Sequence, residues 1–416
     1  MSVSESFSGE STGFVQPRPQ PQPTPDITDK LTDALGDMMM IQNTQRAGSL
    51  GADMFGRPRG EDGSTIIFRG KLLGDAEALY PLIDANFKKY GYTATLQREG
   101  DIDIVIGFDG LIVARKVTSP TWVHALLLAV TIMTTAFSGA AFSGISVTRL
   151  FDEVFKVHNY AIIWVTLQAG APFAITLLLI LGIHEMGHYI AARRHGIDVT
   201  LPYFIPLPFL SPLGTLGAVI FIKDVMRNRK SLFDVGISGP LAGFVVALIA
   251  FIIGMHLPAT IHYNAVFDQF IPGFKGLGMP ILLEAIGKSI RPGTNLSIFA
   301  TQQPVVLAAW FGMLLTVLNL LPLGQLDGGH VMYTLFGRFA WYVAYITFAG
   351  LIIVGVYSNF LSLIFYAGLA ALTGLRHPPP SNDITPLDWR RKLLGYATLV
   401  LFFLIVTPTP FLMTFR

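Results

Sequence analysis

The chain has 416 residues, of which 52% are hydrophobic and only 13% are charged, and its net charge is +2. About 25% of the residues of a typical soluble domain are charged, so this composition indicates a polytopic membrane protein. The absence of cysteine excludes disulfides, thiolate metal ligands and cysteine nucleophiles. The small net charge gives no support for a nucleic-acid partner. A metal site in this chain has to use histidine, aspartate or glutamate.

The first part of the chain divides into a tail and a small domain. Residues 1–60 are rich in Ser, Gly, Pro and Gln and are predicted to be a disordered tail, with one short helix near residues 29–41. Residues 61–117 are predicted to form a small α+β soluble domain on the cytoplasmic side, with an amphipathic helix at residues 75–90. Its strands are predicted at residues 65–69, 92–96 and 102–107. This domain lacks histidine and cysteine and shows no recognisable catalytic constellation.

Residues 118–416 are predicted to form an all-α transmembrane domain. Seven stretches approach the roughly 20 apolar residues that cross a bilayer, and an eighth would follow if the region before residue 171 contains a break. The seven predicted spans are residues 121–142, 160–193, 233–254, 304–323, 338–356, 358–375 and 393–412. Lys and Arg gather on one side of these spans, which places that side and the N-terminus in the cytoplasm.

Three ionisable side chains lie within one turn near the end of the second span. His184 and His188 are four residues apart and share a helix face, so both imidazoles can bind one metal ion. Glu185 projects about 100° round the helix, toward a water on the metal, as the general base of a zinc hydrolase does. Such a motif also occurs by chance in soluble helices. In lipid, however, these side chains would be costly without a function.

A catalytic zinc of this type needs a third protein ligand. The carboxylates that follow His188 are Asp198, Asp224, Asp234, Asp268, Glu284, Asp327, Asp383 and Asp388. Asp268 and Glu284 fall on the opposite side of the membrane, and solvation or helix capping explains most of the others. Asp327 follows the fourth span on the same side as His188, so it is the candidate third ligand.

The motif His184-Glu-Met-Gly-His188, together with Asn319-x-x-Pro-x-x-x-Leu-Asp327-Gly, resembles the site-2 protease family of intramembrane zinc metalloproteases. The resemblance implies Zn²⁺ ligation by His184, His188 and Asp327, with Glu185 as the base. It also implies hydrolysis of a peptide bond within or near the transmembrane segment of a membrane-anchored substrate. Asn319 matches a family asparagine thought to hold the substrate or the developing oxyanion, and an interhelical hydrogen bond is the alternative.

A finer resemblance, to the branch named for ethylene-dependent gravitropism-deficient and yellow-green (EGY) proteins, covers residues 188–243. It rests on the motifs at residues 188–196, 214–218, 228–234 and 239–243. This branch is known from plastids, cyanobacteria and other bacteria, and a prokaryotic plasma membrane is the expected location. Gly239 and Gly243 are predicted to serve close helix packing.

Residues 213–222 are β-branched, contain glycine and are too short to span, which predicts a re-entrant β-hairpin beside the metal. Its free edge, at Gly214, Thr215, Leu216 and Gly217, could bind an unwound substrate segment by strand addition, as proposed for the family. A simple surface connection is the alternative.

Two other functions are weighed against the protease. A divalent-metal transporter would spread its ligands along several spans, whereas the candidate ligands here share one depth. A catalytically inactive, protease-like membrane binding protein is disfavoured by the intact set of His184, Glu185, His188 and Asp327. The expected partners are single-span membrane substrates and the lipid bilayer, and a homo-oligomer is left open.

Overall fold

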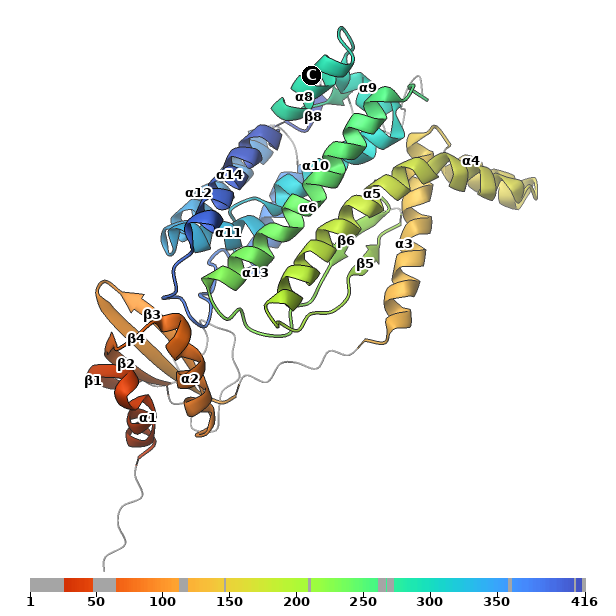
Figure 1. The fold of residues 1–416 in the computed structure, drawn as a ribbon. Coiled ribbons are helices and arrows are strands. Elements are labelled where there is room, and N and C mark those ends of the chain that lie inside the picture. The colour runs from red at the N-terminus through yellow and green to blue at the C-terminus, as the bar shows by residue number, and fades with distance from the viewer. Residues whose placement is uncertain are drawn as a thin grey trace, which may run out of the picture.

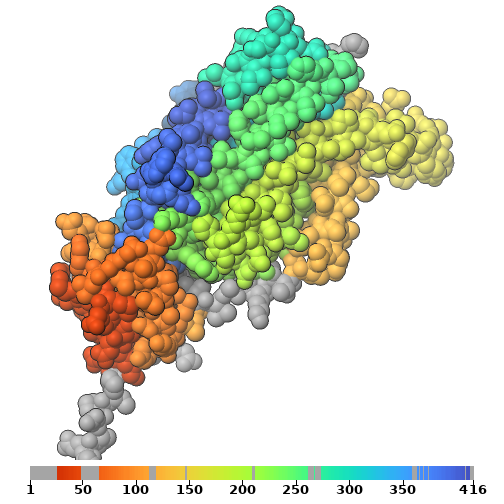
Figure 2. Space-filling view, in the orientation of Figure 1, coloured from red at the N-terminus to blue at the C-terminus, as the bar shows by residue number. Residues whose placement is uncertain are grey.

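The structure is a computed structural model, and it describes residues 26–47, 65–111, 119–145, 147–208, 211–260, 267, 273–357, 361–407 and 409–413. Figures 1 and 2 show a small N-terminal domain at one end of a bundle of long helices. Residues 1–25 and 48–60 of the predicted tail lie outside the described residues.

The N-terminal domain is a four-stranded antiparallel sheet in the order β1-β2-β4-β3, covered by two helices. Its elements are α1 (Ile27–Leu35), β1 (Met39–Ala47), β2 (Thr65–Leu72), α2 (Ala76–Lys88), β3 (Tyr92–Glu99) and β4 (Ile102–Asp109). Leu31 and Phe87 from the helices pack with Phe68 and Leu96 from the sheet in one buried core. The helix and three strands predicted after residue 61 are confirmed.

Helix α1 overlaps the short helix predicted near residues 29–41, but the predicted disorder is wrong for residues 27–47, because α1 and β1 belong to this domain. Strand β1 pairs with β2 from Met39 to Ala47, so the domain begins well before residue 61. Most side chains of β1 are exposed and polar, and the strand lies at an edge of the sheet. Backbone pairing rather than apolar burial holds it, so no hydrophobic alternation marks it in the sequence.

Four helices in the described part of the chain are long and apolar enough to cross a membrane. They are α3 (Thr121–Phe142), α5 (Ala161–Arg194), α6 (Arg229–His256) and α12 (Phe339–Tyr357). A fifth span is formed if α9 (Leu296–Gln302) and α10 (Pro304–Asn319), which meet at a bend of 110°, are counted together. The predicted spans at residues 358–375 and 393–412 contain the shorter helices α13 (Leu361–Thr373) and α14 (Trp389–Ile405).

Short elements cover the end of the bundle away from the N-terminal domain (Figure 1). They are β7 (Phe274–Leu277), α8 (Ile281–Ile290), α9 and β8 (Phe411–Met413), and β7 pairs antiparallel with β8. Between α3 and α5, helix α4 (Val147–Phe151) runs into the π-helical segment Asp152–Lys156. Large apolar side chains on the spans, such as Trp164, Ile175 and Ile346, are exposed, as expected of surfaces that face lipid.

The predicted hairpin is present. Strands β5 (Tyr203–Pro206) and β6 (Thr215–Val219) pair antiparallel and lie between α3 and α5 (Figure 1). The buried hydroxyl of Thr215 donates to the Ile205 carbonyl at 2.9 Å and so ties the two strands together. Within the described residues, β6 has no second strand partner.

Candidate metal centre

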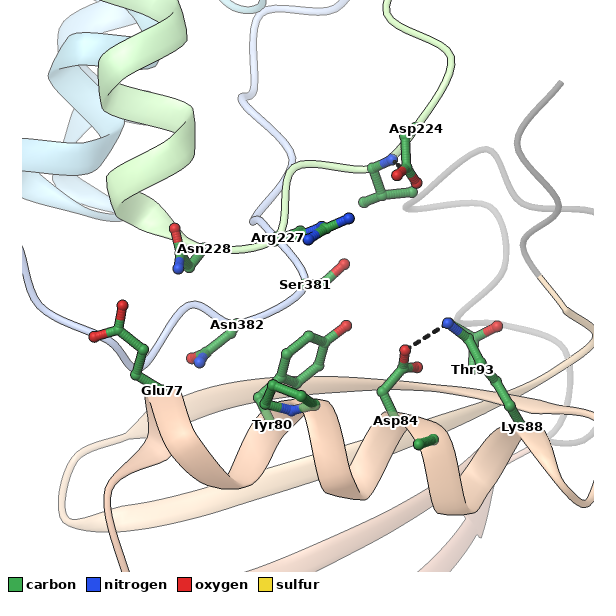
Figure 3. A pocket seen from close by; sticks show the side chains of 13 residues that line it. Glu77, Tyr80, Asp84, Lys88, Thr93, Asp224, Arg227, Asn228, Ser381 and Asn382 are labelled. Carbon is green, nitrogen blue, oxygen red and sulfur yellow. Dashed lines mark hydrogen bonds and ion pairs between the residues drawn. The ribbon is translucent and has the colours of Figure 1, made fainter. Parts of the chain in front are cut away.

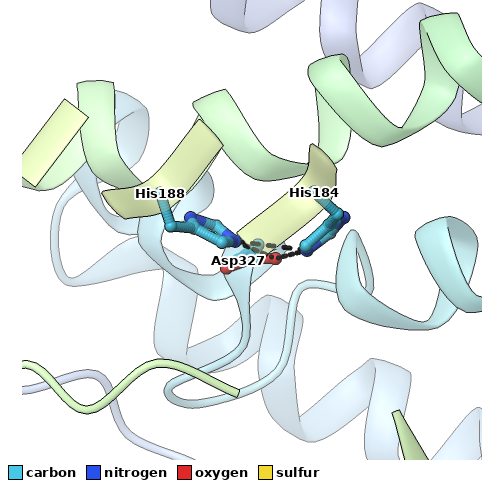
Figure 4. A group of neighbouring side chains, drawn as sticks. All are labelled: His184, His188 and Asp327. Carbon is cyan, nitrogen blue, oxygen red and sulfur yellow. Dashed lines mark hydrogen bonds and ion pairs between the residues drawn. The ribbon is translucent and has the colours of Figure 1, made fainter. Parts of the chain in front are cut away.

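Helix α5 supplies two imidazoles on one face. His184 and His188 are one turn apart, and each keeps less than a tenth of its surface exposed. Their Nε2 atoms are 3.2 Å apart and point to the same space (Figure 4). Burying two imidazoles whose nitrogens converge costs free energy unless the nitrogens share a hydrogen bond or bind a metal ion.

Asp327 is the first residue of α11 (Asp327–Phe336) and faces α5. The start of α11 packs closely against the end of α10, because a Cβ on Gly328 would lie 2.0 Å from the Leu320 carbonyl oxygen. Asp327 Oδ2 then lies 3.4 Å from His184 Nε2 and 3.3 Å from His188 Nε2. The three residues therefore meet, although 139 positions separate His188 from Asp327 in the sequence (327 − 188 = 139).

The spacing of these three donor atoms fits a zinc ion. Tetrahedral zinc with bonds of about 2.0–2.1 Å separates its ligand atoms by about 3.3 Å. The observed separations are 3.2, 3.3 and 3.4 Å. Two imidazole nitrogens and one carboxylate oxygen also form a donor set that zinc accepts with a fourth position left for water. Among the described residues, this is the one His/Asp/Glu group with metal-binding geometry.

Helix α6 holds the histidines from the other side. His188 Nδ1 donates to the Val235 carbonyl at 2.7 Å, which fixes the tautomer and leaves the Nε2 lone pair free for a metal. A Cβ on Gly239 would lie 2.1 Å from His188 Nε2, and one on Gly243 would lie 3.1 Å from His184. The predicted close packing at Gly239 and Gly243 is confirmed, and its specific role is to make room for the two rings.

Glu185 and Asn319 both reach this site. The Glu185 side chain is buried beside the histidines, and the backbone N–H of Ile220, just beyond β6, interacts with its carboxylate. Asn319, the last residue of α10, places its Nδ2 atom 3.3 Å from His184 Nε2. The end of the hairpin, a carboxylate base and an amide donor thus surround the three donor atoms.

The four predicted substrate-binding residues of the hairpin have different surroundings. A Cβ on Gly214 would lie 2.3 Å from the Thr134 carbonyl oxygen, so this glycine packs against α3. Thr215 is buried, whereas Leu216 is 59% exposed. Gly217 has a φ of +116° with open space around it. Leu216 and Gly217 are therefore the two that an incoming chain can reach.

Sequence reasoning missed two contributors from α6, the Val235 carbonyl and the contact between Gly239 and His188. The position of a backbone carbonyl cannot be predicted from residue types. The glycines could have been found, because Gly239 and Gly243 repeat the four-residue spacing of His184 and His188. Two helices that pack side by side bring equal spacings into register.

Comparison with known proteins agrees with this geometry. Residues 172–355, which include all three donors and Glu185, match the sequence model of Peptidase family M50. The central part of the chain is thus similar to this family. The probable zinc metalloprotease EGY2, chloroplastic, of Arabidopsis thaliana is 33% identical over 252 residues, which are 60% of this chain and 43% of that protein. This chain is therefore similar to the EGY group of zinc metalloproteases.

Other relatives extend the match. The probable zinc metalloprotease EGY1, chloroplastic, of Arabidopsis thaliana is 27% identical over 379 residues, which cover 84% of this chain and 67% of that protein. The EGY2 protein of Oryza sativa subsp. indica is 32% identical over 249 residues, 59% of this chain and 44% of that protein. This chain thus spans less than half the length of the first relatives it matches. No solved structure matches it.

Proposed function

We propose that this protein is an intramembrane zinc metalloprotease that hydrolyses a peptide bond within or near the transmembrane segment of a membrane-anchored protein. The observation that carries this proposal is the meeting of His184, His188 and Asp327 at zinc-ligand separations beside the Glu185 carboxylate. The family match and the names of the relatives support the same activity.

The chain's own groups would divide the chemistry as follows. A zinc ion held by His184, His188 and Asp327 would polarise the scissile carbonyl and lower the pKa of a water molecule. Glu185 takes a proton from that water and returns it to the leaving nitrogen. Val235 keeps His188 in the tautomer that binds metal, and the Asn319 amide is a donor for the carbonyl oxygen on which charge develops.

The hairpin is the proposed substrate platform. A transmembrane helix hides its carbonyls in its own hydrogen bonds, so the substrate must unwind before water can attack. Strand β6 offers an edge without a second partner among the described residues, and it ends beside Glu185. An unwound segment that pairs with this edge at Leu216 and Gly217 would be carried toward the base. Single-span membrane proteins are the substrates that this arrangement suits.

The membrane arrangement is also a proposal in its finer detail. We favour seven spans, with α13 and α14 as the last two, and a re-entrant hairpin. Arg193, Arg194, Arg229 and Lys230 lie at the helix ends nearest the N-terminal domain, which supports a cytoplasmic N-terminus. A prokaryotic plasma membrane remains our proposed location, whereas the relatives' names read chloroplastic. Self-association to a homo-oligomer is left open.

The direct test of the chemistry is Glu185→Gln in protein reconstituted with a single-span substrate. Loss of the base should lower the cleavage rate by about 100-fold or more, because general-base catalysis contributes about 10²–10⁴. The zinc content should stay unchanged, since Glu185 is not one of the three donors. Glu99→Gln, on the exposed end of β3, is the matched control and should cleave normally. Full turnover by Glu185→Gln would refute the assignment of the base.

A further inference from the structure

The loop between α13 and α14 touches both the N-terminal domain and the helix that carries Asp327. This loop, residues 374–388, is named the connector here. Ser381, Asn382 and Asp383 contact the N-terminal domain. His377 and Asp383 contact α11. One short segment therefore joins the soluble domain to a candidate metal ligand.

The connector pairs with the free edge of the N-terminal sheet. Strand β3 is an edge strand, and the Leu96 N–H donates to the Ser381 carbonyl at 2.7 Å. The Asp383 N–H donates to the Leu96 carbonyl at 2.9 Å, which completes a parallel bridge. The buried amide of Asn382 donates to the Ala76 carbonyl at 2.9 Å. Such pairing satisfies backbone groups that an edge strand otherwise leaves open.

The docking also encloses a polar cleft between the two parts of the protein. Figure 3 shows side chains of α2 facing Ser381, Asn382 and the stretch before α6 across a cavity of about 390 Å³. At one end of this cleft, Lys230 Nζ lies 2.6 Å from Glu77 Oε2. The N-terminal domain is thus held by backbone pairing, a buried amide and an ion pair.

The connector also contacts α11 through hydrogen bonds and ring stacking. The Asp383 carboxylate accepts hydrogen bonds from the Tyr333 hydroxyl at 2.9 Å and from Arg229 Nε at 2.8 Å. The Tyr333 ring stacks on His377 with centroids 4.9 Å apart, and His377 Nε2 lies 2.5 Å from His330 Nδ1. Burial and the adjacent Asp383 carboxylate raise the pKa of Tyr333 above its usual range, so the phenol keeps its proton and remains a donor.

Helix α11 is short, and its start is held by backbone packing of its glycines rather than by a capping side chain. It has ten residues, and no side chain caps its first turn. Asp327 is its first residue, and His330 and Tyr333 follow one and two turns later. A small rotation of this short helix would move the Asp327 carboxylate away from the histidines on α5.

We propose that Tyr333 and Asp383 are positioning residues that hold α11 so that Asp327 meets His184 and His188, and that docking of the N-terminal domain on the connector strengthens this hold. The proposal rests on the zinc site of the proposed function. It gives the N-terminal domain a role in setting the metal geometry from the membrane surface.

The test compares wild type with Tyr333→Phe and Asp383→Asn, both close in shape to the native residue. Each full-length protein is loaded with Co²⁺ in place of zinc, and the visible d–d absorption reports the ligand geometry. The rate of metal loss to a chelator is then measured. We expect a shifted spectrum and loss about 10-fold faster in both variants, because changes behind a metal ligand weaken binding by about 10–100-fold. Thr32→Val, which removes a hydroxyl bond to the Thr28 carbonyl within α1, is the control.

The outcomes separate this proposal from the proposed function. Wild type that binds neither Co²⁺ nor zinc would refute the proposed function itself. Wild type that binds normally, with both variants matching it in spectrum and metal loss, would overturn the positioning role alone.

The contribution of docking has its own variant. Asn382→Ala combined with Lys230→Glu removes the amide and reverses one charge of the ion pair, without touching α11. We expect the Co²⁺ spectrum to shift in the same direction as in Asp383→Asn. Adding Glu77→Lys should restore part of the wild-type spectrum by re-forming the ion pair. A wild-type spectrum in the double variant would overturn the role of the N-terminal domain.

Discussion

At the scale of single residues, the candidate metal centre depends on the glycines of α6 as much as on the three donor side chains. His188 lies between the Val235 carbonyl, which accepts a hydrogen bond from its Nδ1, and the backbone of Gly239. One hydrogen bond orients the ring, and the absence of a side chain on Gly239 leaves the space that the ring occupies. The position of Nε2, and with it the distance to Asp327, follows from both.

Gly239→Ala should therefore damage the site without disturbing the chemistry of any ligand. The new Cβ would lie 2.1 Å from His188 Nε2, so the ring or the helix must shift. We expect zinc affinity to fall by about 10-fold or more, as for other changes directly behind a ligand. Competition with a chromophoric chelator measures this. Gly350→Ala on α12, where a Cβ meets nothing within 4 Å, is the control, and equal affinity in the two variants would contradict the account.

Much of the site could be predicted from residue types alone. His184, Glu185 and His188 form a local motif, and Asp327 and Asn319 were reached through elimination and family resemblance. The structure brings all five together. The partners that the sequence did not reveal act through the backbone or through missing atoms, as the Val235 carbonyl and Gly239 do. The carbonyl has no signal in the sequence, whereas Gly239 and Gly243 repeat the four-residue spacing of His184 and His188.

At the scale of elements, a capping box stabilises the start of α6, about two turns before Val235. Asn228 sets that start, because its side chain accepts from the Ser231 N–H at 2.8 Å while Ser231 Oγ accepts from the Asn228 N–H at 3.2 Å. This reciprocal capping box satisfies two backbone groups at the membrane surface.

Asn228→Ala should lower the free energy of unfolding by about 1 kcal/mol, the usual cost of a lost N-cap. Denaturant unfolding in detergent measures it. Zinc content should stay near wild type, because the cap lies away from the donors. Asn228→Ser, which keeps a capping oxygen, should recover most of the stability. A loss of zinc without a loss of stability would show that Asn228 acts on the site rather than on the helix.

Helices and strands could be predicted where one buried face makes apolar residues recur at regular spacing along the sequence. The strands and helix of the N-terminal domain after residue 61 and the spans near α3, α5, α6 and α12 carry clear apolar patterns, and all are present. Strand β1 was not predicted, because its polar side chains face outward. The predicted span at residues 304–323 contains α10, and nothing in its apolar run specifies the 110° bend that joins α10 to α9.

At the scale of the whole molecule, the site exists only because distant segments converge. Helix α5 supplies two nitrogens, α11 supplies one oxygen, and α6 packs against both. Sequence order and the positive-inside rule place Asp327 in the right leaflet but give no distance. The approach to 3.3 and 3.4 Å comes from helix packing, including the close contact of Gly328 at the start of α11 with the Leu320 carbonyl.

Metal content tests this convergence most directly. Protein purified in detergent is analysed for zinc in wild type, His184→Ala and Asp327→Ala, with Asp198→Ala as a control for an exposed carboxylate paired with Arg193. We predict about one zinc per wild-type and Asp198→Ala chain, as for a catalytic site with three protein ligands, and a sharp fall in the other two variants. Zinc that is absent from wild type, or that persists after the loss of Asp327, would contradict a centre shared by α5 and α11.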